Sequence, residues 1–436
     1  MLLSATRPAR LNGALAALLR TAAPSREPME RGDWIYLASL FALTRVLIVF
    51  IGLLGTALVP ELALPNSFAL HPLHPGDDIW SRLFDHFDAG WYLGISHSYT
   101  LPGSGPDWLR EWMFFPLYPW VLRPVALVLG LLRVAGNVDA VAGVLVSNTA
   151  LFIALVYLYR LTRGELSTRA ARRAVTYLLI FPGSFYFSAD YPESLYLLCS
   201  VAAFYYARHR KWALAGLAAA LALLTRPQGL LLVVPLLIEL VAWLRAEGLL
   251  GRRALRGLWL GLPLVSLAGY ALYSHAKTGY WLAFEASATQ VWGHRVTPPV
   301  YPLIRYLLAP DLGSATQYDL TSVNFAVTVL FLVVAVLAWR RLPVAYSIWL
   351  LICVLFPLSS LGHNMTSMVR YAAIAFPAFM ALAAWTTGER WTPKGTATDR
   401  ATPLALDLRD RLVLIPSLLL LPFFVVMFVN GILAAV

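Results

Sequence analysis

The chain has 436 residues, of which 59% are hydrophobic and only 13% are charged, and its mean hydropathy is +0.67. Apolar runs recur from Trp34 to the C-terminus, which excludes a soluble globular protein. Unbroken runs of this kind predict an all-α polytopic membrane protein, because a β-barrel would show short alternating segments instead. The net charge of +11 comes largely from arginines in loops between apolar runs. This positive-inside pattern indicates membrane orientation, and no nucleic-acid partner is expected.

The first elements of the chain set its orientation in the membrane. Residues 1–32 form a basic tail that we expect in the cytoplasm, either disordered or lying on the membrane surface. Trp34–Val59 is long enough to span the bilayer and leads outward. Arg45 lies within this span and would cost roughly 2.5–3.5 kcal/mol at mid-helix if unpaired. It should therefore face protein or extend its charged end to the interface.

Residues 60–137 are predicted to form a long first outer loop that carries interfacial helices. The apolar run Leu117–Val134 lies within it, but Pro119, Arg123 and Pro124 interrupt that run. If this run crossed the membrane, the arginine-rich loop that follows Ala140–Tyr159 would lie on the outer side. The charge rule therefore predicts an amphipathic helix along the outer interface for 117–134 and a second span for 140–159.

The rest of the chain brings the total to about eleven spans, with the N-terminus inside and the C-terminus outside. The remaining spans are expected over residues 174–187, 195–207, 212–224, 230–244, 258–273, 323–339, 345–361, 371–385 and 412–429. Several of these runs are short, so they should be buried among other helices or cross only in part. The predicted units are a transmembrane domain over 33–386, a cytoplasmic polar loop over 387–411 and a C-terminal transmembrane helix over 412–436.

This topology separates the ionisable residues between the two faces. The cytoplasmic loops carry mostly arginines, which we interpret as orientation charge. The outer face carries Asp85, Asp88, Glu111, Asp190, Glu193, Arg226, His294, His363 and Arg370. Ionisable groups near a bilayer are costly and usually functional, so the outer face should hold the site. Transporters tend to place such groups near the bilayer midplane on broken helices, whereas here they gather at one face.

Five short motifs follow one another along the chain. They are Phe-Asp-Ala-Gly-Trp-Tyr-Leu at 87–93 with Tyr99, Phe-Phe-Pro-Leu-Tyr-Pro at 114–119, Phe-Pro at 181–182 leading to Tyr-Pro-Glu-Ser at 191–194, Leu-Thr-Arg-Pro-Gln-Gly at 224–229, and Ser-Met-Val-Arg-Tyr at 367–371 leading to Phe-Pro at 376–377. In this order they resemble the GPI mannosyltransferase II (PIG-V-like) family of GT-C glycosyltransferases. The resemblance covers roughly residues 33–385. Two positions depart from the family pattern: Phe87 stands where the family usually has Trp, and Tyr280 stands where it often has an acid.

The resemblance implies a GT-C-like catalytic domain over 33–386 and a polyprenyl-phosphate sugar donor. Asp88 matches the family position of the catalytic acid. As a general base it would take the proton of the acceptor hydroxyl. The leaving lipid phosphate needs charge stabilisation, for which Arg226 and Arg370 are the candidates. The other expected site residues are the supporting acids Asp85, Glu111 and Glu193 and the substrate-lining residues Trp91, Tyr92, Tyr118 and His363.

Each of these assignments has a structural alternative. Asp88 would also be a favoured N-cap for a helix that begins at Ala89. Arg370 would serve equally as an interfacial anchor. Arg226 would pair with Glu193 for structural reasons, and Glu193 would be only an acid at the start of the next helix. A catalytic metal is a further alternative, because His71, His74, Asp77 and Asp78 lie near each other and His86 lies between two acids. Their spacing matches no ligand motif, so no metal or other cofactor is assigned.

The sequence thus predicts a multi-pass membrane glycosyltransferase, in the cell membrane if the organism is prokaryotic, with its site facing outward. It would move a hexose, mannose in first place, from polyprenyl phosphate to a glycolipid or glycan acceptor. Its expected partners are this donor, this acceptor and membrane lipids. The alternatives are the same chemistry with glucose or arabinose, a transporter or flippase of lipid-linked sugars, and a non-catalytic homologue.

Overall fold

The structure is a computed structural model that describes residues 28–58, 78–103, 108–247, 251–310, 321–360, 365–391 and 407–431. All regular elements within these residues are helices. The longer ones are α2 (Arg31–Leu58), α5 (Leu117–Leu131), α6 (Val138–Glu165), α7 (Thr168–Ile180), α8 (Glu193–Arg208), α9 (Trp212–Thr225), α10 (Val233–Ala246), α11 (Leu262–Thr278), α14 (Thr321–Arg341), α15 (Val344–Ser360), α17 (Phe376–Thr386) and α18 (Leu408–Val429). The shorter ones are α3 (Ile79–Phe84), α4 (Ala89–His97), α12 (Ala283–Gln290), α13 (Tyr301–Leu308) and α16 (Met368–Ala373). The 3₁₀ segments are η1 (Arg110–Met113), η2 (Ser184–Phe187), η3 (Pro227–Leu232) and η4 (Arg252–Gly261).

The helices confirm an integral membrane protein with an all-α polytopic fold. Six helical stretches in the described part are long and apolar enough to cross a membrane: 31–58, 138–165, 227–246, 253–278, 321–341 and 408–429. Four more helices are apolar but shorter, namely α5, α9, α15 and α17. The predicted total of about eleven spans, and the placement of α5 along the interface, stay predictions.

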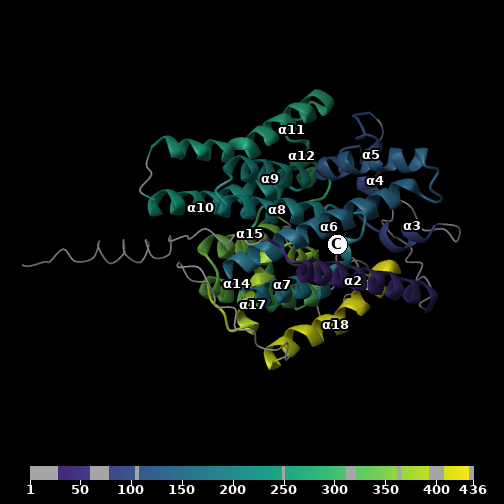
Figure 1. Cartoon of the computed structure of the whole chain (residues 1–436). Coiled ribbons are helices and arrows are strands. Elements are labelled where there is room, and N and C mark those ends of the chain that lie inside the picture. Colours follow the sequence, from purple (N-terminus) through teal and green to yellow (C-terminus); the bar gives the residue numbers. More distant parts are fainter. Residues whose placement is uncertain are drawn as a thin grey trace, which may run out of the picture.

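The bundle is built around α6 and α8. Helices α6, α8, α9 and α11 pack one against the next, and α7 packs on α6 and α17. Figure 1 shows α2 (purple) and α18 (yellow) running together along one side of the bundle, with α11 on the opposite side. Two glycines permit the close approach of α2: a Cβ on Gly55 would lie 3.3 Å from the Cα of Val426, and one on Gly52 would lie 2.8 Å from Leu83 Cδ2. The first and last described helices therefore close one wall of the bundle together with α3.

Two predicted spans are not continuous helices. The run 174–187 ends as α7 at Ile180 and continues as η2, and the run 371–385 is divided between α16 and α17. Both breaks lie just before a Phe-Pro pair, Phe181-Pro182 and Phe376-Pro377. The residue before a proline is disfavoured in helical conformation, so α7 ends before Phe181. Pro377 lies in the first turn of α17, where its missing N–H removes no helical hydrogen bond, so the second pair marks the start of a new helix. The C-terminal helix likewise begins at Leu408 rather than at 412, where the capping box of Asp407 starts it.

Several arginines that we interpreted as orientation charge also have buried partners. Arg208, at the C-terminal end of α8, is fully buried and donates to Glu165 Oε1 at 2.5 Å and to Glu239 Oε2 at 2.9 Å. Arg163 donates to Asp33 at 3.0 Å, and Arg173 pairs with Asp410. Acids in neighbouring helices supply the counter-charges of these arginines, and their role as orientation charge stays a prediction. These pairs join α6, α8 and α10, and tie α2 and α18 to the bundle.

Arg45 of α2 faces protein, which is one of the two placements that the sequence predicts for it. Its guanidinium is buried and donates to the Ser184 carbonyl at 2.9 Å, to Ser188 Oγ at 3.1 Å and to the Leu179 carbonyl at 3.3 Å. The break between α7 and η2 supplies these acceptors, because carbonyls outside a continuous helix are free to bond elsewhere. Arg45 thus holds the segment from which Tyr186 reaches the site.

Candidate active site

Four charged side chains from four distant segments meet at one end of the bundle. Arg370 of α16 donates through Nη1 to Asp88 Oδ2 at 2.7 Å, and its Nε donates to Glu193 Oε1. Arg226, between α9 and η3, donates through Nη2 to the same Glu193 oxygen. The centre is therefore a chain of ion pairs that runs Asp88, Arg370, Glu193, Arg226. Among the predicted site residues, two acids and both arginines come together, and one of these acids, Glu193, joins the two arginines.

Asp88 occupies the start of α4 but does not cap it. It stands at the N-cap position with helical backbone angles, and its side chain makes no capping hydrogen bond. The capping alternative is therefore wrong. Phe87, directly before it, has a φ of +53°, in the left-handed region that is unfavourable for a bulky residue. The Tyr191 hydroxyl accepts from the Asp88 backbone N–H at 3.1 Å and donates to the His86 carbonyl at 2.8 Å, which holds this turn in place.

Arg370 is held from several sides. Ser367, the N-cap of α16, also has a positive φ of +66°, so a strained residue stands at or just before the cap of both short helices at the Asp88–Arg370 pair. The Arg370 guanidinium lies 4.5 Å from the ring centre of Tyr191 and 6.0 Å from that of Tyr186. Such cation–π contacts add to ion pairing when the charge is desolvated. Arg370 is thus a buried, oriented group, and an interfacial anchor would not need this set of partners.

Glu193 is the first residue of α8 and is completely buried. Its Oε1 receives both arginines, while Oε2 has no hydrogen-bond partner among the described residues. In the same part of the chain Arg226 Nη1 also lacks a partner, and the Arg226 guanidinium lies 5.0 Å from the Tyr371 ring centre. The structural pairing considered for Arg226 therefore exists, and it leaves one buried N–H group of Arg226 available to a ligand.

Comparison with known proteins identifies this arrangement. The sequence matches the family described as mannosyltransferase (PIG-V) over residues 37–283, which is more than half of the chain. The chain belongs to the PIG-V mannosyltransferase family. The family resemblance derived from the motifs is thereby confirmed. No curated protein matches the chain significantly.

One solved structure supports the fold of this PIG-V family member, and another is less similar. ArnT from Cupriavidus metallidurans, bound to undecaprenyl phosphate, has a TM-score of 0.50 and 14% sequence identity, with 93% of this chain and 77% of that chain covered. The apo oligosaccharyltransferase of Archaeoglobus fulgidus has a TM-score of 0.43 and 14% identity, with 89% of this chain and 56% of that chain covered. The family member thus spans little more than half the length of the oligosaccharyltransferase. The similarity to ArnT confirms a GT-C-like membrane fold.

In this PIG-V family member, aromatic residues that the sequence predicts to line the substrate lie near the four ion-paired residues of the centre. Tyr92 is buried beside it and interacts electrostatically with all four charged groups. Trp91 stacks on Phe114 with ring centres 5.9 Å apart. Tyr118 donates to the Gly143 carbonyl at 3.1 Å and shares a 3.0 Å hydrogen bond with Ser147, on the α6 side of Tyr92. Tyr92 therefore lies beside the centre, and Tyr118 packs against Tyr92. Trp91 joins the same aromatic group through Phe114.

The remaining assignments fall outside the ion-pair chain. Glu111 accepts from the Thr100 N–H at 2.8 Å and from Thr100 Oγ1 at 3.0 Å, which organises the turn between α4 and η1. Asp85 ends α3 and acts electrostatically on Asp190. His363 lies outside the described residues, as do His71, His74 and Asp77.

His86 is described, but it does not resemble a metal ligand. It is buried, and its Nε2 donates to the Arg82 carbonyl at 2.8 Å. Burial lowers the pKa of His86 to about 4, against a smaller opposing effect of that hydrogen bond, so the ring is neutral at pH 7. Within the described residues no group of three or more His, Cys, Asp or Glu side chains is arranged to hold a metal ion.

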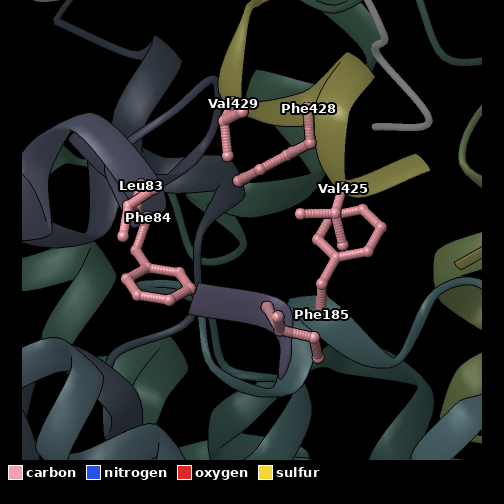
Figure 2. Close-up of a pocket in the computed structure, with 7 residues that line it drawn as sticks. Leu83, Phe84, Phe185, Val425, Phe428 and Val429 are labelled. Carbon is pink, nitrogen blue, oxygen red and sulfur yellow. The ribbon is translucent and has the colours of Figure 1, made fainter. Parts of the chain in front are cut away.

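A small apolar pocket lies behind the aromatic residues of the site. Figure 2 shows Leu83 and Phe84 of α3 facing Phe185 and the α18 residues Val425, Phe428 and Val429 across it. Phe428 separates this pocket from the centre, since its ring lies 5.6 Å from that of Tyr186 and 6.4 Å from that of Tyr191. The C-terminal helix therefore forms the back of the site.

The sequence placed Asp190 at the outer face but gave it no role. It is fully buried, and neither carboxylate oxygen has a hydrogen-bond partner in the described part of the chain. It packs so tightly on α6 that a Cβ on Gly143 would collide with its Oδ1. Burial raises the pKa of Asp190 well above its usual range, and the negative charges of Asp85, Asp78 and Asp139 raise it further. In the folded protein the neutral form of Asp190 is therefore the stable one. The next residue, Tyr191, contacts both Asp88 and Arg370.

The Asp190→Asn variant should be more stable than the wild type, and the difference should grow as the pH rises. A carboxyl whose pKa is raised by folding favours the folded state at low pH and loses that contribution above its unfolded pKa of about 4. An amide has no such dependence. Thermal unfolding of the purified protein at pH 5 and pH 8 measures the effect.

Asp78 offers a matched control with the opposite sign. Burial alone would raise the pKa of Asp78, but hydrogen bonds from the backbone N–H groups of Asn137, Ser81 and Trp80 and from the Ser81 hydroxyl hold it below its usual range. Asp78→Asn should therefore lower the unfolding temperature, more so at pH 5 and above than near pH 3. A shift in Asp190→Asn that is independent of pH would contradict the neutral state assigned to Asp190.

Proposed function

We propose that this PIG-V family enzyme transfers a hexose, mannose in first place, from polyprenyl phosphate to a hydroxyl of a glycolipid or glycan acceptor at the outer face of the membrane. The observation that carries the proposal is the meeting of a partly exposed carboxylate, Asp88, with Arg370, Glu193 and Arg226. The side chain of Asp88 is 20% exposed, whereas those of Arg370 and Glu193 are 5% and 0% exposed. Asp88 is therefore the acid that an acceptor can reach.

The groups match the needs of glycosyl transfer. The acceptor oxygen attacks C1 of the sugar and its proton passes to Asp88, while the bond between C1 and the phosphate oxygen breaks. The electron pair of that bond leaves with the polyprenyl phosphate, so atoms and charge balance. The Asp88 carboxylate acts as general base. Arg226 and Arg370 stabilise the negative charge that develops on the departing phosphate.

A lipid-linked donor fits the surroundings of the centre. The site belongs to a chain with at least six helices able to span a membrane, and its back wall is the apolar end of α18. ArnT, whose fold this chain shares, was solved bound to undecaprenyl phosphate. By the positive-inside rule the loops that carry the four charged residues lie outside. A donor held in the membrane by its prenyl chain would present its phosphate near the outer surface, where these loops lie.

The experiment uses membranes that contain the full chain, a lipid extract as acceptor source, and radiolabelled polyprenyl-phosphate mannose, glucose or arabinose. We expect labelled glycolipid or glycan from the mannose donor, and at least tenfold less from the other two, since pocket contacts discriminate related substrates by about tenfold or more. Label that crosses the bilayer without forming a new product would support a flippase instead. Equal transfer from another sugar would change the assigned hexose.

A further inference from the structure

The Arg370 guanidinium has two carboxylate partners of very different exposure. Glu193 is completely buried and also pairs with Arg226, whereas Asp88 is partly exposed and lies on the accessible side of its pair with Arg370. The faces of Tyr191 and Tyr186 cover the guanidinium from another direction. An anion that approaches Arg370 must therefore come from the side that Asp88 occupies.

The centre has no positive charge to spare. Two guanidinium groups, Arg226 and Arg370, face two carboxylates, Asp88 and Glu193, so their formal charges cancel. A sugar linked to a lipid through one phosphate is a phosphodiester that carries one negative charge. To bring that charge into a partly buried site without a counter-charge would be costly. One of the two carboxylates must leave its arginine when the phosphate arrives.

Asp88 is free to leave, and Glu193 is not. Asp88 makes no capping hydrogen bond, and its backbone N–H is fixed by the Tyr191 hydroxyl, so its side chain can rotate while the backbone stays in place. Glu193 is completely buried between two guanidinium groups, and its departure would leave both uncompensated. Arg226 Nη1 has no partner among the described residues and offers the phosphate a second donor.

We propose that the donor phosphate displaces Asp88 from Arg370, so that the carboxylate becomes available as a base only when the donor is bound. This inference rests on the proposed function and adds an order of events to it. Before the donor binds, Asp88 Oδ2 is occupied by Arg370 Nη1. When the phosphate takes that N–H, Asp88 turns toward the acceptor side. Asp88 is thus a competitor of the donor phosphate as well as the base.

The test measures binding rather than turnover. The purified full chain in detergent is titrated with farnesyl phosphate, a sugar-free prenyl phosphate, by calorimetry. Asp88→Asn should bind farnesyl phosphate about tenfold more tightly than the wild type, because the neutral amide holds Arg370 less strongly than the carboxylate does and no longer repels the phosphate. Asp88→Ser should behave in the same way, and thermal unfolding shows whether each variant is folded.

A matched control distinguishes the loss of the Asp88–Arg370 contact from the general effect of removing one negative charge. Asp139→Asn removes one carboxylate at the N-terminal end of α6, where Asp139 pairs with His97 at 2.9 Å. It should leave the affinity within about twofold of the wild type, since Asp139 pairs with His97 and Arg123 and with neither arginine of the centre. A gain in Asp139→Asn as large as that in Asp88→Asn would overturn the proposal, because the effect would then be general.

A double-mutant cycle distinguishes this proposal from the proposed function. Arg370→Gln should weaken binding of farnesyl phosphate, and in that background Asp88→Asn should no longer tighten it. One outcome would contradict only the displacement of Asp88: Arg370→Gln weakens binding, but Asp88→Asn alone does not tighten it. In that case Arg370 still binds the phosphate, but the phosphate does not displace Asp88. If Arg370→Gln and Arg226→Gln both leave the affinity unchanged, the proposed phosphate site itself is wrong, and the displacement of Asp88 fails with it.

Discussion

Asp88→Asn should reduce sugar transfer by about a thousandfold, within the range of 10² to 10⁴ that a general base contributes. Asparagine keeps the size of the side chain and can still accept a hydrogen bond from Arg370, so the fold should be retained. What the variant loses is the ability to take the acceptor proton. The rate of label transfer from polyprenyl-phosphate mannose by purified protein measures the loss.

Asp139→Asn is the control for this rate, since it removes an acid of the same type that pairs with His97 away from the centre. Its transfer rate should stay within a few-fold of the wild type. The combination expected for Asp88→Asn, slower transfer with tighter binding of prenyl phosphate, is hard to obtain from a damaged fold. Transfer by Asp88→Asn at a rate near that of the wild type would remove Asp88 from the role of base.

Glu193→Gln should both destabilise the protein and abolish transfer. The substitution leaves Arg226 and Arg370 next to each other without the carboxylate that joins them. Breaking a buried ion pair by removing one partner typically costs about 3–5 kcal/mol. The two guanidinium groups should then separate, and the donor phosphate would lose its paired contacts. Thermal unfolding and the transfer assay follow the two effects.

Glu285→Gln makes the same chemical change at an exposed position of α12. Exposed substitutions away from special contacts are usually within about 0.5 kcal/mol of neutral, so this variant should unfold near the wild-type temperature. Equal unfolding temperatures for Glu193→Gln and Glu285→Gln would mean that Glu193 does not hold the arginines together in the folded protein.

The sequence was enough to predict a helical membrane fold, the family and the four residues that meet at the centre, with Glu193 expected only as a supporting acid. Asp88, Arg226 and Arg370 are ionisable residues beside apolar runs, and each lies in a motif of the family. Such groups are rare in membrane proteins, so their positions carry information. The pairing of Arg226 with Glu193 was also foreseen as an alternative, although not the second contact of Glu193 with Arg370.

Other features of the site could not be predicted because they depend on tertiary contacts. Nothing in the local sequence indicates that the Tyr191 hydroxyl holds the turn at Asp88, or that its ring covers Arg370. The positive φ values of Phe87 and Ser367 are unusual for their residue types, and only the surrounding packing imposes them. Propensity and periodicity therefore locate the helices but not the strained turns between them.

Two Phe-Pro pairs in the sequence indicate helix breaks that the predicted spans do not include. The Phe-Pro pairs at 181–182 and 376–377 lie inside apolar runs that we expected to span the membrane without a break. In the structure the first pair follows the end of α7 and the second begins α17, in accordance with the positions at which proline is tolerated around a helix. The first of these breaks also frees the carbonyls that Arg45 binds.

The central claim is that sugar leaves a lipid-linked phosphate at the centre formed by Asp88, Arg370, Glu193 and Arg226. The most direct measurement uses purified wild-type protein in liposomes and a polyprenyl-phosphate mannose labelled differently in its sugar and in its lipid. The account predicts that the sugar label appears in a new glycolipid or glycan while an equal amount of lipid label appears as free polyprenyl phosphate. Transfer of mannose from a nucleotide-activated donor without any lipid donor, or no release of polyprenyl phosphate, would contradict it.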